Sequence, residues 1–424
     1  MTTSGARTRV SPLADAAVLA MLAYTRSTMR AEMIGGEGFR FQRGTLVLFS
    51  HRRFEDVPLL ASSLYLRARA WRSRDSLPHV AAREDIFHPG FLAGFRAGTP
   101  LWLRRILYPV SLASWLPRFR AHPVSSATTL KLGEALSLLP AETPLESVLA
   151  PRVLALLEAR ARELGLRPPL RPGDVLRAEF ADLLLAILER DELVGPAAAP
   201  VWEQKAGASL VALRELVELV RAGEPLLLSP EGRVSPDGAI GPLDRAVGLL
   251  LRRGRPETLL HLGVAYDPLT RGRPWAYVAF GSPLATPEAD AEAVVLSELR
   301  RLTPLTCGQV VAARLARACA DGRGSLSEGE VMNLLAAEVA DARVVDRPVP
   351  AALASTDERR RRVAGCLSAL ERRGLIRRRG ASFAIDSDRV ADDPELRYLV
   401  REFESARDLL PDGRPGSERG IAIR

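Results

Sequence analysis

Short apolar runs typical of β-strands recur along the chain and alternate with helical patterns. The clearest are GTLVLF at 44–49, PLLLS at 225–229, LLHLGVAY at 259–266 and WAYVAF at 275–280. The second run follows a stretch with leucine and valine at helical spacing, which stops at Gly223. Strands that alternate with helices predict an α/β fold, with a mixed, mostly parallel sheet flanked by helices.

The same patterns divide the chain into three parts. Residues 1–40 are predicted to form an N-terminal helical segment that ends in the turn GGEG, and residues 41–285 an α/β domain. Inside that domain, proline breaks and runs of alanine and leucine over about 125–205 predict a helical insertion. Residues 286–424 are expected to form a helical C-terminal domain with winged-helix-like character.

The charge balance calls for an acidic partner. The formal net charge is +8 for 424 residues, of which 26% are charged. Nucleic acid, an anionic membrane surface and phosphorylated small molecules all fit, so the choice must come from motifs.

No segment predicts a membrane span. Asp15 and Arg26 limit the uncharged run in LADAAVLAMLAY to about half of the roughly 20 residues that a span needs. We expect a helix packed on the protein, with a helix lying on the membrane surface as the alternative.

The cysteines predict neither disulfides nor a zinc site. Cys307, Cys319 and Cys366 are few and irregularly spaced, which fits a reducing cytoplasm. We expect no metal and no bound cofactor.

One candidate site follows the run at 44–49. In SHRRFED, His51 stands five positions before Asp56. A carboxylate bonded to one ring nitrogen can orient a histidine that acts as general base through the other. Five residues correspond to about 140° around a helix, so we place His51 just before a helix and Asp56 in its first turns. A capping or core role for His51 is the alternative.

A second candidate site follows the run at 225–229, where Glu231, Gly232 and Arg233 stand at the end of a predicted strand. Loops at the carboxyl ends of strands form the ligand crevice of open α/β sheets. Glycine lets the backbone approach a ligand, and the arginine fork suits phosphate oxygens. An ordinary surface turn with a solvated Glu–Arg pair is the alternative.

Together the two segments resemble the glycerolipid acyltransferase family, which acylates glycerol-3-phosphate and lysophospholipids. Its first block, a histidine, four residues and an aspartate after a strand, is matched by His51 and Asp56. Its third block commonly reads Phe-Pro-Glu-Gly-Thr-Arg-Ser; here SPEGRVS places Arg233 one position early. The resemblance implies that His51 is the general base, oriented by Asp56, and that Glu231, Gly232 and Arg233 bind substrate.

The resemblance covers about 40–125 and 205–285. Within it, Arg83 and Glu84 take the places of a basic and an acidic residue of the family's next strand. The second block is poorly matched, and its phosphate-binding arginine is sought at Arg118 or Arg120 in PRFRAHP.

This resemblance implies an O-acyltransferase of phospholipid biosynthesis. The acyl chain would pass from acyl-CoA or acyl carrier protein to a lysophospholipid hydroxyl, with 1-acylglycerol-3-phosphate as first acceptor and glycerol-3-phosphate as the alternative. The expected partners are these substrates and an anionic membrane surface. The expected location is peripheral, on the cytoplasmic face of the membrane.

The C-terminal part supports an alternative of another class. Residues 357–386 predict a helix, a glycine turn and a short basic hairpin, much like a winged helix on DNA phosphates. Nucleic acid is the less favoured partner, because few aromatic residues are available for stacking and basic faces also bind anionic headgroups. A catalytically inactive acyltransferase fold that serves as a binding module is a third hypothesis.

Overall fold

The computed structural model describes residues 12–37, 39–67, 77–94, 98–124, 129–232 and 234–407. The chain forms two compact units, of which the first comprises Met1–Pro78 with Val220–Arg424 and the second His79–Leu219. Residues 286–407 thus belong to the same unit as the central strands, and 79–124 fall in one unit with the predicted insertion.

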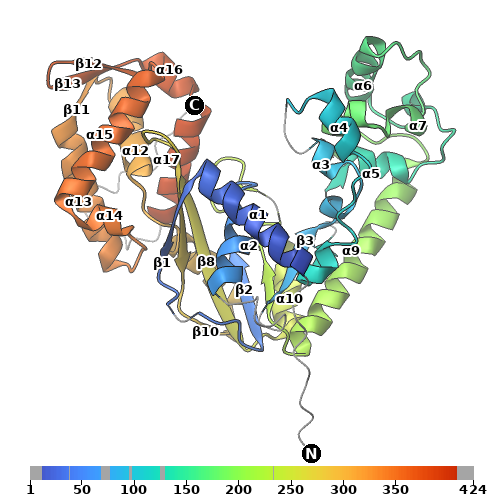
Figure 1. The fold of residues 1–424 in the computed structure, drawn as a ribbon, viewed down its shortest axis with the longest axis horizontal. Coiled ribbons are helices and arrows are strands. Elements are labelled where there is room, and N and C mark those ends of the chain that lie inside the picture. Colours follow the sequence, from blue (N-terminus) through green and yellow to red (C-terminus); the bar gives the residue numbers. More distant parts are fainter. Residues whose placement is uncertain are drawn as a thin grey trace, which may run out of the picture. The chain divides into compact units, whose positions relative to one another are not determined.

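The first unit is built on a mixed sheet with the strand order β1-β9-β8-β2-β7 (Figure 1). β2 pairs in parallel with β7 and β8, β1 pairs in parallel with β9, and β8 pairs antiparallel with β9. The strands are β1 (Arg30–Ile34), β2 (Thr45–Phe49), β7 (Leu226–Leu228), β8 (Thr258–Asp267), β9 (Trp275–Phe280) and the short β10 (Leu284–Ala285), which pairs with β8. The predicted mixed, mostly parallel sheet is therefore present.

The central strands are apolar because helices cover them. All five residues of β2 are buried, as are all three of β7. The helices of this part are α1 (Pro12–Thr28), α2 (Asp56–Arg67), α10 (Arg245–Gly254) and α11 (Ala291–Arg301). The side chain of Asp244 caps α10 by accepting a hydrogen bond from the amide of Ala246.

The N-terminal segment is not wholly helical, which corrects the prediction for residues 1–40. α1 ends at Thr28, and Arg30–Ile34 form β1 beside β9. Gly35 and Gly36 follow with positive φ angles of 72° and 70°, which glycine adopts without strain. The strand forms because Met33 and Ile34 can pair along an edge that β9 leaves open.

The C-terminal part of this unit combines helices with a small antiparallel sheet of order β11-β13-β12. Its elements are α12 (Cys307–Ala320), β11 (Ser325–Ser327), α13 (Glu328–Val344), α14 (Ala351–Ala354), α15 (Thr356–Arg372), β12 (Ile376–Arg379), β13 (Ser382–Ile385), α16 (Ser387–Asp392) and α17 (Pro394–Arg407). The predicted helix, glycine turn and basic hairpin are present as α15, Gly374 and β12–β13. Winged-helix character beyond this element order stays a prediction.

The second unit contains the parallel pair β3 (His79–Arg83) and β4 (Ala121–Val124), and a largely helical region with its own core. That region holds α5 (Leu132–Ser137), α6 (Pro151–Glu163), α7 (Pro172–Val175), α8 (Ala181–Leu184), most of α9 (Ala198–Arg221), and the two-residue strands β5 (Leu130–Lys131) and β6 (Ile187–Leu188); α3 (Phe91–Gly94) and α4 (Leu101–Leu107) lie between β3 and β4. The helical content predicted for about 125–205 is thus observed.

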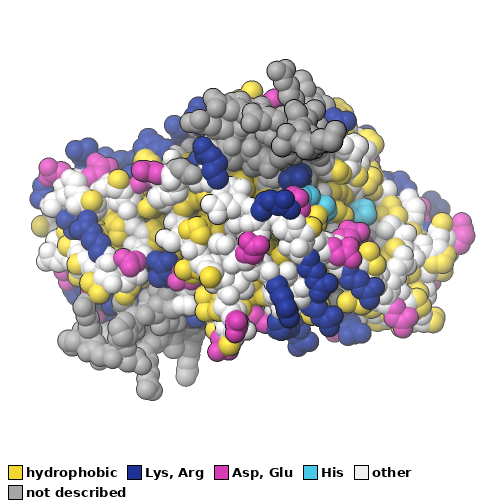
Figure 2. Space-filling view, turned by 90° about the horizontal axis from the view of Figure 1, so that it is seen from below, with side chains coloured by type: hydrophobic (Ala, Val, Ile, Leu, Met, Phe, Trp, Pro, Cys, Tyr) yellow, Lys and Arg dark blue, Asp and Glu magenta, His cyan; other side chains and the backbone are white. Residues whose placement is uncertain are grey.

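Two surface properties bear on the expected membrane contact. Among the helices in the described part of the chain, none is long and apolar enough to cross a membrane. On the face shown in Figure 2, several Lys and Arg side chains lie close together in the lower middle of the view.

Candidate functional site

The candidate site is assembled where three parallel strands of the first unit end. His51 follows β2, Glu231 follows β7, and Tyr266 stands one residue before the end of β8. Because β2 lies between β7 and β8 and runs parallel to both, the carboxyl ends of all three strands meet at one edge of the sheet. The sequence placed both candidate segments at strand ends, and the sheet order makes them neighbours.

His51 and Asp56 form a pair with the geometry of a base and its orienting carboxylate. Nδ1 of His51 lies 2.9 Å from Oδ2 of Asp56. His51 is 8% exposed, and Asp56 is fully buried as the first residue of α2, where the sequence placed it. No hydrogen bond to Nε2 occurs among the described residues, so a histidine in this arrangement can accept a proton at Nε2.

Asp56 is held by several donors. Its Oδ2 also accepts hydrogen bonds from the backbone amides of Arg52, at 2.5 Å, and Arg53, at 3.0 Å, which begin the turn into α2. Its Oδ1 accepts a hydrogen bond from the hydroxyl of Tyr266 at 2.5 Å. Burial and then the Asp56 carboxylate raise the pKa of Tyr266 well above its usual range, so Tyr266 stays a donor. This network fixes the carboxylate that would orient His51.

Glu231 links the loop after β2, which carries His51, to the loop after β7, to which Glu231 itself belongs. Its Oε1 accepts a hydrogen bond from the amide of His51 at 3.4 Å, and its Oε2 accepts one from the amide of Gly241 at 3.3 Å. The amide of Ser235 donates to the carbonyl of His51 at 2.9 Å. Burial raises the pKa of Glu231, while the charge of Arg52 and the two amides act in the opposite direction. Glu231 thus has a structural role in the site; its predicted contact with substrate stays a prediction.

Gly232 adopts a φ of 67°, and a Cβ there would lie 3.0 Å from Oδ2 of Asp244. A side chain would therefore be strained at this position, which explains the glycine between Glu231 and the following arginine. That arginine, Arg233, lies outside the described residues, so its predicted contact with the acceptor phosphate stays a prediction.

The other predicted phosphate ligands belong to the second unit. Arg118 is exposed, and Arg120 is half-buried with a φ of 58°. Of the family-like pair at the end of β3, Arg83 bonds to Asp85, while Glu84, the residue after the strand, lies 3.0 Å from the buried Nζ of Lys205. The substrate-binding roles of these arginines stay predictions.

Residues that no motif indicated complete the site. Arg52 is 1% exposed, and its guanidinium donates to the carbonyl of Gly238 at 2.6 Å. Its Nε lies 3.5 Å from Oε1 of Glu402 on α17. The neighbouring Arg53 lies over the rings of Tyr266 and Tyr398. Tyr266 could have been noted from its place at a strand end, whereas nothing in the sequence points to partners more than 340 positions away.

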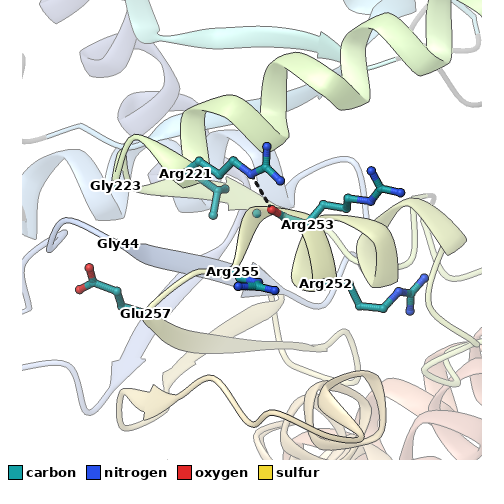
Figure 3. A pocket seen from close by; sticks show the side chains of 9 residues that line it. Gly44, Arg221, Gly223, Arg252, Arg253, Arg255 and Glu257 are labelled. Carbon is teal, nitrogen blue, oxygen red and sulfur yellow. Dashed lines mark hydrogen bonds between the residues drawn. The ribbon is translucent and has the colours of Figure 1, made fainter.

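A large open cavity of about 610 Å³ lies elsewhere in the first unit (Figure 3). Its lining includes Gly44, Gly223 and Glu257, which precede β2, β7 and β8. The cavity is therefore at the amino ends of the strands whose carboxyl ends carry the candidate site. Four arginines line it: Arg221, Arg252, Arg253 and Arg255. The histidine paired with a carboxylate, His51 with Asp56, lies at the carboxyl ends and not among the residues that line this cavity.

Comparisons with known proteins find little that is similar. No protein-family model and no curated protein sequence matches the chain. Among solved structures, the 1-acyl-sn-glycerophosphate (LPA) acyltransferase of Thermotoga maritima is weakly similar, with 11% sequence identity and a TM-score of 0.32. The similarity covers 68% of this chain and 73% of that one. It is too weak to establish a family.

Proposed function

We propose that the protein is an O-acyltransferase that moves a fatty acyl chain from a thioester to a hydroxyl of a phosphorylated glycerolipid precursor. The observation that carries this proposal is the buried contact of 2.9 Å between His51 Nδ1 and Asp56 Oδ2 at the carboxyl edge of the sheet. It is supported by the resemblance of the two strand-end segments to the glycerolipid acyltransferase blocks.

The geometry suits direct transfer. Nε2 of His51 accepts the proton of the acceptor hydroxyl as its oxygen attacks the thioester carbonyl carbon. The tetrahedral intermediate then breaks its C–S bond, and the imidazolium returns the proton to the leaving sulfur. Asp56 holds Nδ1 in its protonated form and stabilises the imidazolium, so no nucleophilic serine or cysteine is needed.

The proposed donor is acyl-CoA or acyl carrier protein, and the proposed acceptor is 1-acylglycerol-3-phosphate, with glycerol-3-phosphate as the alternative. Thiol release from long-chain acyl-CoA, measured with each acceptor and with none, tests the proposal. Release that depends on a lysophospholipid is expected. Release that no acceptor stimulates would contradict it, and the same assay with acylated carrier protein identifies the donor.

Peripheral binding to an anionic membrane surface is part of the proposal. The net charge of +8 and the arginines at the amino ends of the strands favour contact with phosphate headgroups. Binding to anionic vesicles that falls as ionic strength rises is the expected behaviour.

The nucleic-acid alternative has one observation in its favour. Arg377, Arg378 and Arg379 are exposed on the hairpin strand β12. However, α15 is engaged with the sheet, because Arg362 lies 4.0 Å from the ring centroid of Trp275 and Arg372 donates to the carbonyl of Thr270. Tight, sequence-selective binding of duplex DNA by the full chain would favour this alternative.

A further inference from the structure

Helix α17 contacts both loops of the candidate site. One set of its residues, Leu396, Leu399, Val400 and Phe403, is buried in the core of the C-terminal part. Other residues of the same helix point their polar groups at the loops that carry His51 and Glu231. Its contacts reach the His51 loop 346 positions earlier in the chain and the Glu231 loop 165 positions earlier.

The loop that carries His51 is bound to α17 at three places. The Arg52 guanidinium faces Glu402 at 3.5 Å, and the hydroxyl of Tyr398 donates to the Arg52 carbonyl at 3.3 Å. Arg53 lies 3.4 Å from a carboxylate oxygen of Glu395. The amides of Arg52 and Arg53 are the ones that hold Asp56, so these contacts act on the residue that orients His51.

The loop that carries Glu231 is fitted against the same helix. The amide of Ile240 donates to Oγ of Ser405 at 3.1 Å. Gly238 has a φ of 90°, and a Cβ there would lie 2.3 Å from the carbonyl oxygen of Tyr398. The backbone of this loop thus approaches α17 as closely as a glycine allows.

Glu402 is itself held from inside the C-terminal part. Its Oε2 accepts a hydrogen bond of 2.7 Å from Nε2 of Gln309 on α12. The Oε1 of Gln309 accepts from Arg347, which also donates to the carbonyl of Thr303. Arg52 donates to the hydroxyl of Thr303 at 3.2 Å. A buried polar network therefore runs from the C-terminal core to Arg52, the residue next to His51.

Charge and burial explain why Glu402 matters to this loop. Although burial by itself opposes the charge, Glu402, then Tyr398, Glu231 and Asp56 raise the pKa of Arg52 above its usual value. A buried guanidinium that loses its main counter-charge must move toward water or another acid. Because the Arg52 amide donates to Asp56, a shift that reaches this backbone would also reach the residue that orients His51.

We propose that α17 is a positioning element of the candidate site, in which Glu402 holds the His51 loop through Arg52 and Ser405 holds the Glu231 loop. This inference rests on the proposed function for its consequence in catalysis. It assigns the C-terminal part a role in setting the geometry of the base, since a displacement of about 1 Å can cost on the order of 10²-fold in rate.

The test compares two substitutions on one helix in the full chain. Glu402→Gln removes the buried counter-charge and keeps the side-chain size. Glu404→Gln makes the same chemical change two residues away, where the carboxylate lies 3.7 Å from the exposed Arg401. Two readouts are taken: hydrogen exchange of the amides in 50–56 and 235–241, and kcat with KM in the thiol-release assay.

The expected result is faster exchange in both segments for Glu402→Gln, with kcat lowered by about 10²-fold and KM for both substrates little changed. Glu404→Gln is expected to match the wild type.

Exchange rates and kcat that are equal in the two variants would overturn the proposal. If Glu402→Gln does not fold, Tyr398→Phe and Ser405→Ala take its place in the test, because each removes only a neutral hydrogen bond. Unchanged hydrogen exchange in both variants would then overturn the proposal. If the wild type transfers no acyl group to any acceptor, the proposed function fails, and the exchange comparison still decides whether α17 holds the loops.

Discussion

The two ends of β2, β7 and β8 differ: the carboxyl ends carry the candidate base, and the amino ends carry a cluster of positive charge. At the carboxyl ends, His51 and Asp56 are buried, Glu231 is half-buried, and hydrogen bonds join them to backbone amides and to Tyr266. At the amino ends lies the cavity of about 610 Å³ with its four arginines. A base that works in a transition state needs fixed partners, whereas attraction of an anion needs only accessible charge. Cavity size alone would therefore place the proposed reaction at the end that lacks the His51–Asp56 pair.

The arginines at the amino ends also have a local structural cause. Arg221 is the last residue of α9, and Arg252 and Arg253 stand in the last turn of α10. Cations at these positions interact favourably with the carbonyl end of the helix dipole. Arg255 follows α10 with a φ of 50°. These helices end beside the strand starts, so their terminal arginines gather around one cavity.

The largest expected effect is at the carboxyl ends. His51→Ala should lower turnover by at least the 10²–10⁴-fold typical of a lost general base, with the fold intact. Thiol release and circular dichroism measure the two properties. Because Asp56 accepts four hydrogen bonds, Asp56→Asn should also lose activity, since an amide can present a donor where only acceptors fit.

A histidine outside this network provides the control. His88 belongs to the second unit and faces Glu84 at 3.8 Å. His88→Ala should keep normal turnover. Near-normal turnover of folded His51→Ala would show that His51 is not the base and that the reaction does not take place at the carboxyl ends of these strands.

The second effect concerns vesicle binding by the amino ends. Replacing Arg221, Arg253 and Arg255 by glutamine should weaken binding to anionic vesicles at low salt by roughly 150-fold, since each basic residue near such a surface contributes about 1 kcal/mol. Turnover on short-chain, water-soluble substrates should stay normal. Vesicle sedimentation over a salt series measures the first property.

Three arginines of the C-terminal part give the matched variant: Arg360, Arg361 and Arg377, all exposed. The sequence led us to expect that the C-terminal part contributes to membrane binding, and glutamine at these positions tests this without disturbing α17. Loss of vesicle binding in this variant alone would place the membrane contact there and leave the amino-end cavity without that role.

The third effect separates the two ends by ligand. If Arg233 grips the acceptor phosphate, Arg233→Ala should raise the acceptor KM by roughly 10- to 150-fold, because charge-assisted hydrogen bonds contribute roughly 1.5–3 kcal/mol. The KM for the thioester and the binding to vesicles should hardly change. An unchanged acceptor KM, together with a raised one for Arg118→Ala or Arg120→Ala, would assign the phosphate to the second unit.

The sequence was sufficient for the parts of the site that depend on local pattern. The runs at 44–49 and 225–229 predicted two strands, and the spacing from His51 to Asp56 predicted a histidine before a helix with the aspartate in its first turns. These two segments are neighbours because β2 and β7 are adjacent in the sheet. A family resemblance could suggest this strand order, but the local pattern of either segment could not. The strand at 30–34 was missed because its pairing with β9 is contact between distant segments.

The network behind the site was beyond sequence reasoning for a physical reason. In the sequence, Arg52 cannot be distinguished from the many surface arginines, because its burial depends on partners on α17 and α12. Neither Glu402 nor Gln309 belongs to any short motif. Burial of a charge is decided by packing across the whole unit. The sequence therefore predicted the basic surface of the C-terminal part, but it did not predict that this part contacts the His51 loop.

The smallest effect at neutral pH concerns His261, which lies on β8 between the two ends. Its side chain is fully buried, and neither ring nitrogen has a hydrogen-bond partner among the described residues. Burial lowers the pKa of His261 to about 4. The unfolded value is about 6.5, so the unfolded state binds more protons between these two values. The free energy of unfolding should therefore fall by about 3 kcal/mol as pH is lowered through this window.

His261→Leu should remove this loss and raise the free energy of unfolding at pH 7 by about 1 kcal/mol, because two unsatisfied polar atoms disappear. Urea unfolding at pH 7 and pH 5 measures both effects. His88→Leu, at a half-exposed position, should show neither gain, because Glu84 raises the pKa of His88 and protonation there favours the folded state. The variant also sharpens the assignment of the base. If His51 is the group whose protonation stops the reaction, the acid limb of kcat/KM stays in place in His261→Leu. If that limb moves together with the free energy of unfolding, the wild type loses activity in acid because protonation of His261 unfolds it. The pH profile would then not report the protonation of His51.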